Sequence, residues 1–248
     1  MKYKHVLCFL VVTSCYHTYA QERVTTFGIQ FKPIISSELL STGKLQIEQN
    51  NIFYTVTPNT GSSFGMVIRK GLNKTLSIET GINYLTRKFE LNIKDDLFNY
   101  NESSVFKMVN YEIPLSLLVY IRLFEHIYMN VSGGVAADIY PSDLYTYSDN
   151  FQNDILVLDW FRQSLIANLG WEYRTDKSGY IYIGASYHRP FAEMAKERVW
   201  YHGNKRNERV EFSLSGNYIT LDFRYFFHED PEKRKKKTKK SRPSLEKR

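Results

Sequence analysis

The sequence predicts an all-β protein: an eight-stranded antiparallel up-and-down transmembrane β-barrel with a disordered basic C-terminal tail. Two patterns predict the barrel. Apolar and polar residues alternate with period two in one segment after another, and tight turns alternate with long polar connections. A third observation is composition, because aromatic residues make up 15% of the 248 residues. We expect a signal peptide over 1–20, the barrel over 21–227 and a periplasmic tail over 228–248.

The net charge of +7 belongs to the two ends of the chain. Residues 228–248 carry ten Lys and Arg against four Asp and Glu, the first twenty residues carry two Lys, and the stretch between them has a balance of −1. A neutral body lacks the basic face that a nucleic-acid-binding domain requires. We therefore expect no nucleic-acid partner.

Cysteine and hydropathy exclude further classes of protein. The 2 cysteines, Cys8 and Cys15, both lie near the N-terminus, which excludes a disulfide scaffold, a CxxC zinc site and a cysteine nucleophile in the body. No apolar run reaches the roughly 18 residues of a transmembrane helix, whereas the alternating strands of a transmembrane barrel average to modest hydropathy.

The first twenty residues have the three parts of a signal peptide. Lys2 and Lys4 precede the apolar run 6–12, and Ala20 offers a cleavage site. Two alternatives remain open at this point, a lipid attached to Cys15 in a lipobox-like Val-Thr-Ser-Cys and an ordinary buried N-terminal strand.

The clearest alternation covers 111–123, where every odd position is apolar. Eight segments follow this pattern: 24–35, 62–72, 75–91, 105–124, 126–139, 159–175, 179–190 and 211–227. Long polar connections join the first segment to the second, the third to the fourth, the fifth to the sixth and the seventh to the eighth. These connections are 36–61, 92–104, 140–158 and 191–210. Short turns on one side and long loops on the other are typical of outer-membrane barrels, and an even strand number puts both termini on the short-turn side.

The apolar face is predicted to meet lipid rather than a soluble core. Its partner face carries Gly, Ser and Asn with charges of both signs, and aromatic residues gather near strand ends as in an interface girdle. The interior of an eight-stranded barrel is just wide enough for side chains. Four acids and four arginines fall on that inward face: Arg69, Glu79, Glu112, Arg122, Arg162, Glu172, Asp222 and Arg224. They predict a neutral structural plug, and a selective ion path is the alternative.

The residues give little support for catalysis. Ser186 and His188 share a strand face, but that face points into the predicted lumen, away from lipid substrates. The 6 histidines have no metal-ligand spacing, and no Gly-rich phosphate loop is present. We predict no cofactor, no metal and no enzymatic activity.

The tail residues 233–240 form a run of basic side chains without aromatics. Such runs are usually solvated and often bind polyanions. Behind a signal peptide, the available polyanions are lipid head groups, anionic cell-wall polymers and acidic envelope proteins.

A family resemblance adds to this interpretation. The long strand 111–120, centred on Ile113-Pro114-Leu115, resembles the "EIPL" strand of the PorT-like outer-membrane β-barrel proteins of Bacteroidota. The segments 27–29 and 221–227 and the strand with Gly133-Gly134 look similar, so the resemblance covers about 24–227. It implies an eight-stranded barrel without cofactor or shared catalytic residues. PorT itself belongs to a protein secretion machinery, and the basic tail departs from the usual ending of the family.

The sequence thus predicts a non-enzymatic protein of the cell outer membrane. It would act through long external loops or as a component of an envelope or secretion assembly. Its expected partners are outer-membrane lipid and, through the tail, envelope proteins or anionic cell-wall polymers. Two other functions remain open, a barrel-borne lipid-modifying enzyme and a soluble periplasmic ligand-binding barrel.

Overall fold

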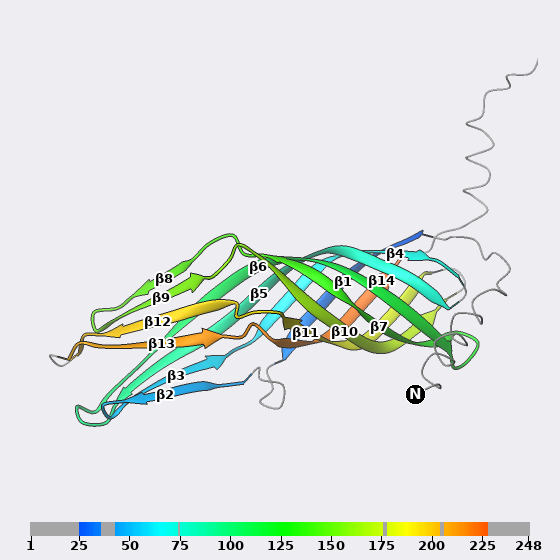
Figure 1. Ribbon diagram of the computed structural model, residues 1–248. Helices are drawn as coiled ribbons and strands as arrows, with labels where there is room; N and C mark the ends of the chain where they lie inside the picture. The colour runs from blue at the N-terminus through cyan, green and yellow to red at the C-terminus, as the bar shows by residue number, and fades with distance from the viewer. Residues whose placement is uncertain (1–24, 36–42, 74, 176–177, 204–205, 228–248) are drawn as a thin grey trace, which may run out of the picture.

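A computed structural model describes residues 25–35, 43–73, 75–175, 178–203 and 206–227 (Figure 1). The predicted signal peptide at 1–20, with Cys8 and Cys15, and the predicted tail at 228–248 lie outside the described residues. The described parts of the chain form fourteen β-strands. They contain no helix of the length and apolarity needed to cross a membrane.

Antiparallel pairing joins eight of these strands into a closed ring. Each pairs with the next in the order β1-β4-β5-β6-β7-β10-β11-β14, and β14 pairs with β1. The ring strands are β1 (Thr25–Ile35), β4 (Gly61–Gly71), β5 (Leu76–Asp95), β6 (Tyr100–Arg122), β7 (Ile127–Ile139), β10 (Phe161–Arg174), β11 (Tyr180–Pro190) and β14 (Tyr218–Phe226). This confirms the predicted all-β antiparallel class.

The wall of the ring is apolar outside and polar inside. In β6, for example, Leu115 and Leu117 point outward and are about half exposed, whereas Glu112 points inward and is buried. The outward set gathers large apolar side chains from every ring strand, among them Phe27, Ile29, Phe31, Phe64, Met66, Ile82, Val131, Val135, Leu165, Leu169, Ile183, Leu221 and Phe223.

The long connections are not loops, which corrects the sequence prediction. They contain six short strands: β2 (Leu45–Gln49), β3 (Ile52–Pro58), β8 (Leu144–Tyr147), β9 (Phe151–Val157), β12 (Ala195–Tyr201) and β13 (Glu208–Leu214). In Figure 1 these strands extend the molecule at one end, opposite the short turns. β3 pairs with the extended part of β5 and β2 pairs with β3, whereas β8, β9, β12 and β13 form a second, four-stranded sheet.

The two sheets enclose one hydrophobic core, so this end of the molecule is a β-sandwich. Hereafter "the sandwich" denotes β2, β3, residues 86–95 of β5, residues 100–110 of β6, and β8, β9, β12 and β13. Its core draws on both sheets: Ile52, Tyr54, Val56, Phe89, Leu91, Ile93, Phe106, Met108, Tyr140, Phe151, Ile155, Met194, Ala195, Val199, Tyr201, Val210, Phe212 and Leu214. Asn50 and Asn51 adopt the positive φ angles, 52° and 63°, that a tight two-residue hairpin requires.

The last predicted strand, 211–227, is also corrected. It divides into β13, which belongs to the sandwich, and β14, which belongs to the ring. Gly216 lies between them with a φ of 77°, a left-handed conformation that glycine adopts without steric cost.

Candidate functional site: lumen and rim pocket

The lumen near the short turns is filled by ion pairs between arginines and acids. Arg69 contacts Glu172, and its Nη2 lies 3.0 Å from Glu79 Oε2. Arg224 contacts the same Glu79 and places its Nη2 2.6 Å from Asp222 Oδ2. All of these side chains are buried, so each charge is neutralised within the barrel.

Aromatic rings cover this network. The guanidinium of Arg69 lies 3.8 Å from the ring centroid of Phe226, and that of Arg174 lies 4.1 Å from the ring of Tyr128 and 4.8 Å from the ring of Tyr120. Stacked guanidinium and aromatic planes fill the space between the ion pairs.

A second polar layer, centred on Glu112, lies closer to the sandwich. His188 Nδ1 is 2.8 Å from Glu112 Oε2, and the Tyr218 hydroxyl donates to the same oxygen at 2.7 Å. The other oxygen accepts from Asn83 Nδ2 at 2.8 Å. The His188 and Tyr218 rings stack within this layer with their centroids 4.2 Å apart.

The structure places the eight sequence-predicted charges as follows. Arg69, Glu79, Glu172, Asp222 and Arg224 form the first layer, and Glu112 forms the second. Arg162 is buried but pairs with Asp159 at 3.0 Å rather than with the lumen network.

Arg122 was placed wrongly. It is exposed at the end of β6, where its guanidinium donates to the carbonyls of Phe124 and Glu125 in the adjacent turn. Alternation put it on the inward face, but the barrel ends before this residue can be covered.

Three buried charges of the lumen and its junction with the sandwich were absent from the predicted set. Lys32 Nζ lies 3.7 Å from Asp222 Oδ2, Asp138 accepts from Ser164 at 2.7 Å, and Arg87 lies where the lumen meets the sandwich. All three occupy inward positions of alternating segments, so strand parity could have found them. With them, the buried lysine and arginines Lys32, Arg69, Arg87, Arg162 and Arg224 match in number the buried lumen acids Glu79, Glu112, Asp138, Glu172 and Asp222.

The structure does not unite Ser186 and His188 as a catalytic pair. The Ser186 hydroxyl donates to Asp222 Oδ2 at 2.6 Å, whereas His188 faces Glu112. Among the described residues, no group of His, Cys, Asp and Glu side chains could hold a metal ion.

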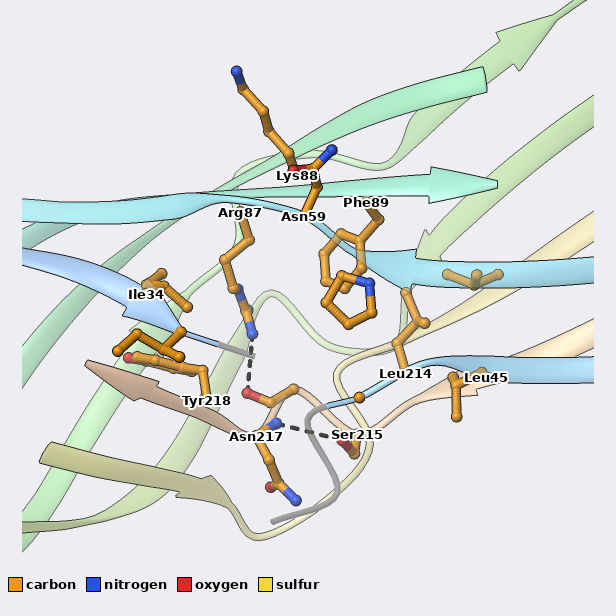
Figure 2. Close-up of a pocket in the computed structure, with 15 residues that line it drawn as sticks. Ile34, Leu45, Asn59, Arg87, Lys88, Phe89, Leu214, Ser215, Asn217 and Tyr218 are labelled. Atoms are coloured by element: carbon orange, nitrogen blue, oxygen red, sulfur yellow. Dashed lines mark hydrogen bonds between the residues drawn. The ribbon is translucent and has the colours of Figure 1, made fainter. Parts of the chain in front are cut away.

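A pocket opens where the barrel rim meets the sandwich (Figure 2). This rim pocket is a cavity of about 60 Å³. Its wall comes from the end of β1, from β2, β3 and β5, and from the link between β13 and β14, with Ile34, Leu45, Val56, Phe89 and Leu214 as its apolar side chains.

Arg87 is the buried charge of the rim pocket. Its side chain, only 4% exposed, donates from Nη1 to the Gly216 carbonyl at 2.9 Å and from Nη2 to the Tyr140 hydroxyl at 3.2 Å. Its Nη2 also contacts the Met194 sulfur, and its buried Nε has no hydrogen-bond partner. No ion pair joins Arg87 to a carboxylate of the described residues.

Comparisons with known proteins identify the fold. No family model matches the chain, and no curated protein is significantly similar to it. Among solved structures, the outer membrane protein OprG of Pseudomonas aeruginosa matches 84% of this chain and 98% of its own, at 10% identity and a TM-score of 0.52. The fold is that of an outer-membrane β-barrel. The outer membrane protease OmpT of Escherichia coli matches 85% of this chain and 97% of its own, at 8% identity, but its TM-score of 0.36 is too low to carry an argument.

The outward apolar wall and this fold place the protein in the outer membrane. A soluble ligand-binding barrel would turn its apolar face inward, and the inward face here holds the buried charges. The soluble periplasmic alternative is therefore excluded.

Proposed function

We propose that the protein is a non-enzymatic, non-conducting eight-stranded transmembrane barrel that displays the sandwich outside the cell as an interaction surface. The observation that carries the proposal is the filling of the interior by side chains. Buried ion pairs and hydrogen bonds around Arg69 and around Glu112 occupy the lumen, and the sandwich has a hydrophobic core of its own. An interior filled by side chains stabilises the shape of the barrel and does not serve as a route for solutes.

The orientation follows the convention of outer-membrane barrels. Short turns join β4 to β5, β6 to β7 and β10 to β11 at one end, and the sandwich lies at the other. Outer-membrane barrels have short periplasmic turns and longer external segments, so the sandwich would face the surroundings of the cell.

The outer face of the four-stranded sheet suits binding. One row across this sheet contains Arg209, Trp200, Gln152 and Tyr147, which are direct cross-strand neighbours. Tyr147 is 68% exposed, and the Arg209 guanidinium lies 5.2 Å from the Trp200 ring. Aromatic side chains interleaved with planar polar groups are enriched where proteins bind partners.

The proposal also includes the assembly and the partners with which the protein acts. The resemblance to PorT-like barrels supports a role in an envelope or secretion assembly, with envelope proteins or anionic cell-wall polymers as partners of the basic tail. No activity is assigned to the barrel, because Ser186 and His188 bond to different acids.

Conductance in planar bilayers tests the filling of the interior. The unmodified protein should insert without steady current, because side chains occupy the lumen around Arg69 and around Glu112. Stable ohmic single channels from the unmodified protein would contradict the proposal and put transport in its place.

Site-specific photo-crosslinking in intact cells tests the interaction surface. A photoreactive residue at Tyr147 should give discrete adducts with envelope or external macromolecules. The matched control is Leu169, which is about half exposed on the lipid-facing wall and should give lipid adducts alone. Identical patterns from the two positions would argue against a binding role for the sheet.

A further inference from the structure

We propose that the rim pocket binds a single-chain amphipathic carboxylate, with the carboxylate on Arg87 and the hydrocarbon chain along the apolar wall. The site is distinct from the outer face of the sandwich. This proposal is therefore tested independently of the function proposed above.

The first argument is the state of Arg87. A buried guanidinium without an ion-paired carboxylate is costly, and buried cations are normally paired. Asp138 is a nearby acid whose charge interacts with Arg87, but its two oxygens accept hydrogen bonds from Asn110 at 3.2 Å and from Ser164 at 2.7 Å. The Nε atoms of Arg87, Arg162 and Arg224 all lack a hydrogen-bond partner, but Arg162 and Arg224 each contact a carboxylate through Nη2, whereas Arg87 does not. An anion in the pocket would supply the charge that Arg87 lacks.

The second argument is the contrast with the other lumen arginines. Arg69 contacts two carboxylates, and Arg224 contacts two. Arg87 instead has a carbonyl, a hydroxyl and a thioether, all of them neutral. The buried arginine that lines the pocket is thus the one whose direct contacts carry no negative charge.

The third argument is the chemistry of the walls. Ile34, Leu45, Val56 and Phe89 line one part of the pocket, and the polar side chains besides Arg87 include Asn59, Lys88 and Asn217. A small inorganic anion would leave the apolar side chains facing water. An apolar chain attached to the anion would cover them, at about 25 cal/mol for each Å² removed from water.

The size of the cavity limits the ligand. By the same measure one water needs roughly 10–15 Å³, so about 60 Å³ holds a carboxylate and the first few carbons of a chain. We expect the remainder of the chain to run outward past Ile35, which lines the pocket and is also 41% exposed at the end of β1, next to the lipid-facing residues of that strand. A two-chain lipid with a bulky head group does not fit this room.

Equilibrium binding of radiolabelled dodecanoate to the full protein in a non-ionic maltoside detergent tests the assignment. We expect saturable binding to one site and at least about tenfold weaker binding by Arg87→Leu, because a charge-assisted hydrogen-bond pair is lost. The matched control is Lys107→Leu, which removes an exposed cation of the sandwich that does not line the pocket and should leave the affinity unchanged.

Two other ligands distinguish recognition of the carboxylate from nonspecific hydrophobic binding and from recognition of a phosphate. Dodecanol should bind the unmodified protein at least about tenfold more weakly than dodecanoate, and Arg87→Leu should abolish that difference. Binding of dodecanol as tight as that of dodecanoate would overturn the role of Arg87. Tighter binding of dodecyl phosphate than of dodecanoate would overturn the carboxylate in favour of a lipid phosphate.

Leu45→Trp is a second variant that tests the pocket even if Arg87→Leu does not fold. Leu45 lies on the edge strand β2 and is 37% exposed, so a larger side chain should be tolerated by the fold while it fills the pocket. Folded Leu45→Trp, verified by heat-modifiable migration, should lose dodecanoate binding. Retained binding in this variant, or no binding by the unmodified protein, would overturn the proposal.

Discussion

The barrel and the sandwich are built by the same alternation with opposite polarity. In the barrel part of β5, Glu79 points inward and Ile82 points outward to lipid. In the sandwich part of the same strand, Leu91 and Ile93 point inward and the outward positions are polar. The buried positions of β5 are odd-numbered in both regions. The same face of the strand therefore points inward along its whole length, and only the surroundings of the two faces change.

This difference shows that the surroundings, rather than the backbone, decide which face is apolar. β6 makes the same change, with Phe106 and Met108 buried in the sandwich and Glu112 buried in the lumen. In water the enclosed face must be apolar, whereas in lipid the outward face must be. The change of polarity near residues 85 and 110 marks where the membrane ends and the sandwich begins.

The largest expected effect comes from removing a shared acid in the lumen. Glu79→Ala leaves Arg69 and Arg224 each short of a partner and should cost on the order of 3–5 kcal/mol of unfolding free energy. Denaturant unfolding in lipid vesicles measures this loss, which should appear before any pore opens.

The control lies on the same strand in the other region. Glu90→Ala removes an acid from the outward, polar face of the sandwich and should change stability by about 0.5 kcal/mol or less. Similar losses from both variants would contradict the difference between the two interiors.

A charge on the lipid-facing wall should have the next largest effect. Leu117→Arg puts a cation mid-strand in the membrane and should cost about 2–4 kcal/mol. Ser213→Arg puts the same side chain on the exposed face of β13 in the sandwich and should cost little. Equal folded yields in lipid would show that the outward wall does not meet the bilayer.

A smaller, pH-dependent effect should distinguish the sandwich. Burial raises the pKa of Glu197 to about 8 from 4.5, and the Asn153 amide offsets only part of this rise. A raised folded-state pKa means that the folded protein holds the proton more tightly. Its contribution to stability is therefore complete below about pH 4.5 and is lost as the pH rises towards 8.

Hydrogen exchange of sandwich amides at pH 5 and pH 9, corrected for intrinsic rates, measures this change. We expect a loss on the order of 2 kcal/mol at the higher pH, because relaxation and hydration reduce the full effect of the shifted pKa. Glu197→Gln should remove the pH dependence. An unchanged profile in that variant would assign the effect to another group.

The smallest effect should follow removal of 228–248. Because β14 ends at Phe226 and the Phe227 amide donates to the Phe27 carbonyl at 2.8 Å, the ring is complete without the tail. Truncation should leave heat-modifiable migration intact while it weakens attachment to anionic cell-wall polymers. A truncated chain that does not assemble would show that the tail takes part in the fold.

The sequence predicted the barrel wall well, because long runs with one unbroken apolar face have few other structural solutions. It did not predict the sandwich, whose strands β9 and β12 are short and have Asn153 and Glu197 among their inward positions. These polar residues interrupt the apolar pattern and made the segments look like loops. The alternation was nevertheless present at Ile155 and Val199.

The lumen shows a different limit. Strand parity located most inward charges, but the pairing of Arg69 with Glu172 joins residues 103 positions apart and depends on which strands face each other across the barrel. Parity also cannot show where a barrel stops, and this is why Arg122 was misplaced. The rim pocket depends on the junction between two regions, one of which the sequence did not indicate.

The sandwich also constrains the order of assembly. If it lies outside the cell, its hairpins must cross the bilayer from the periplasm, including the β5–β6 turn at 96–99. A folded two-sheet sandwich is too thick to pass through an eight-stranded ring whose interior side chains fill. The hairpins must therefore be translocated while extended, and the hydrophobic core around Val199 and Leu91 forms last. Burial of these side chains then opposes the return of the hairpins through the bilayer.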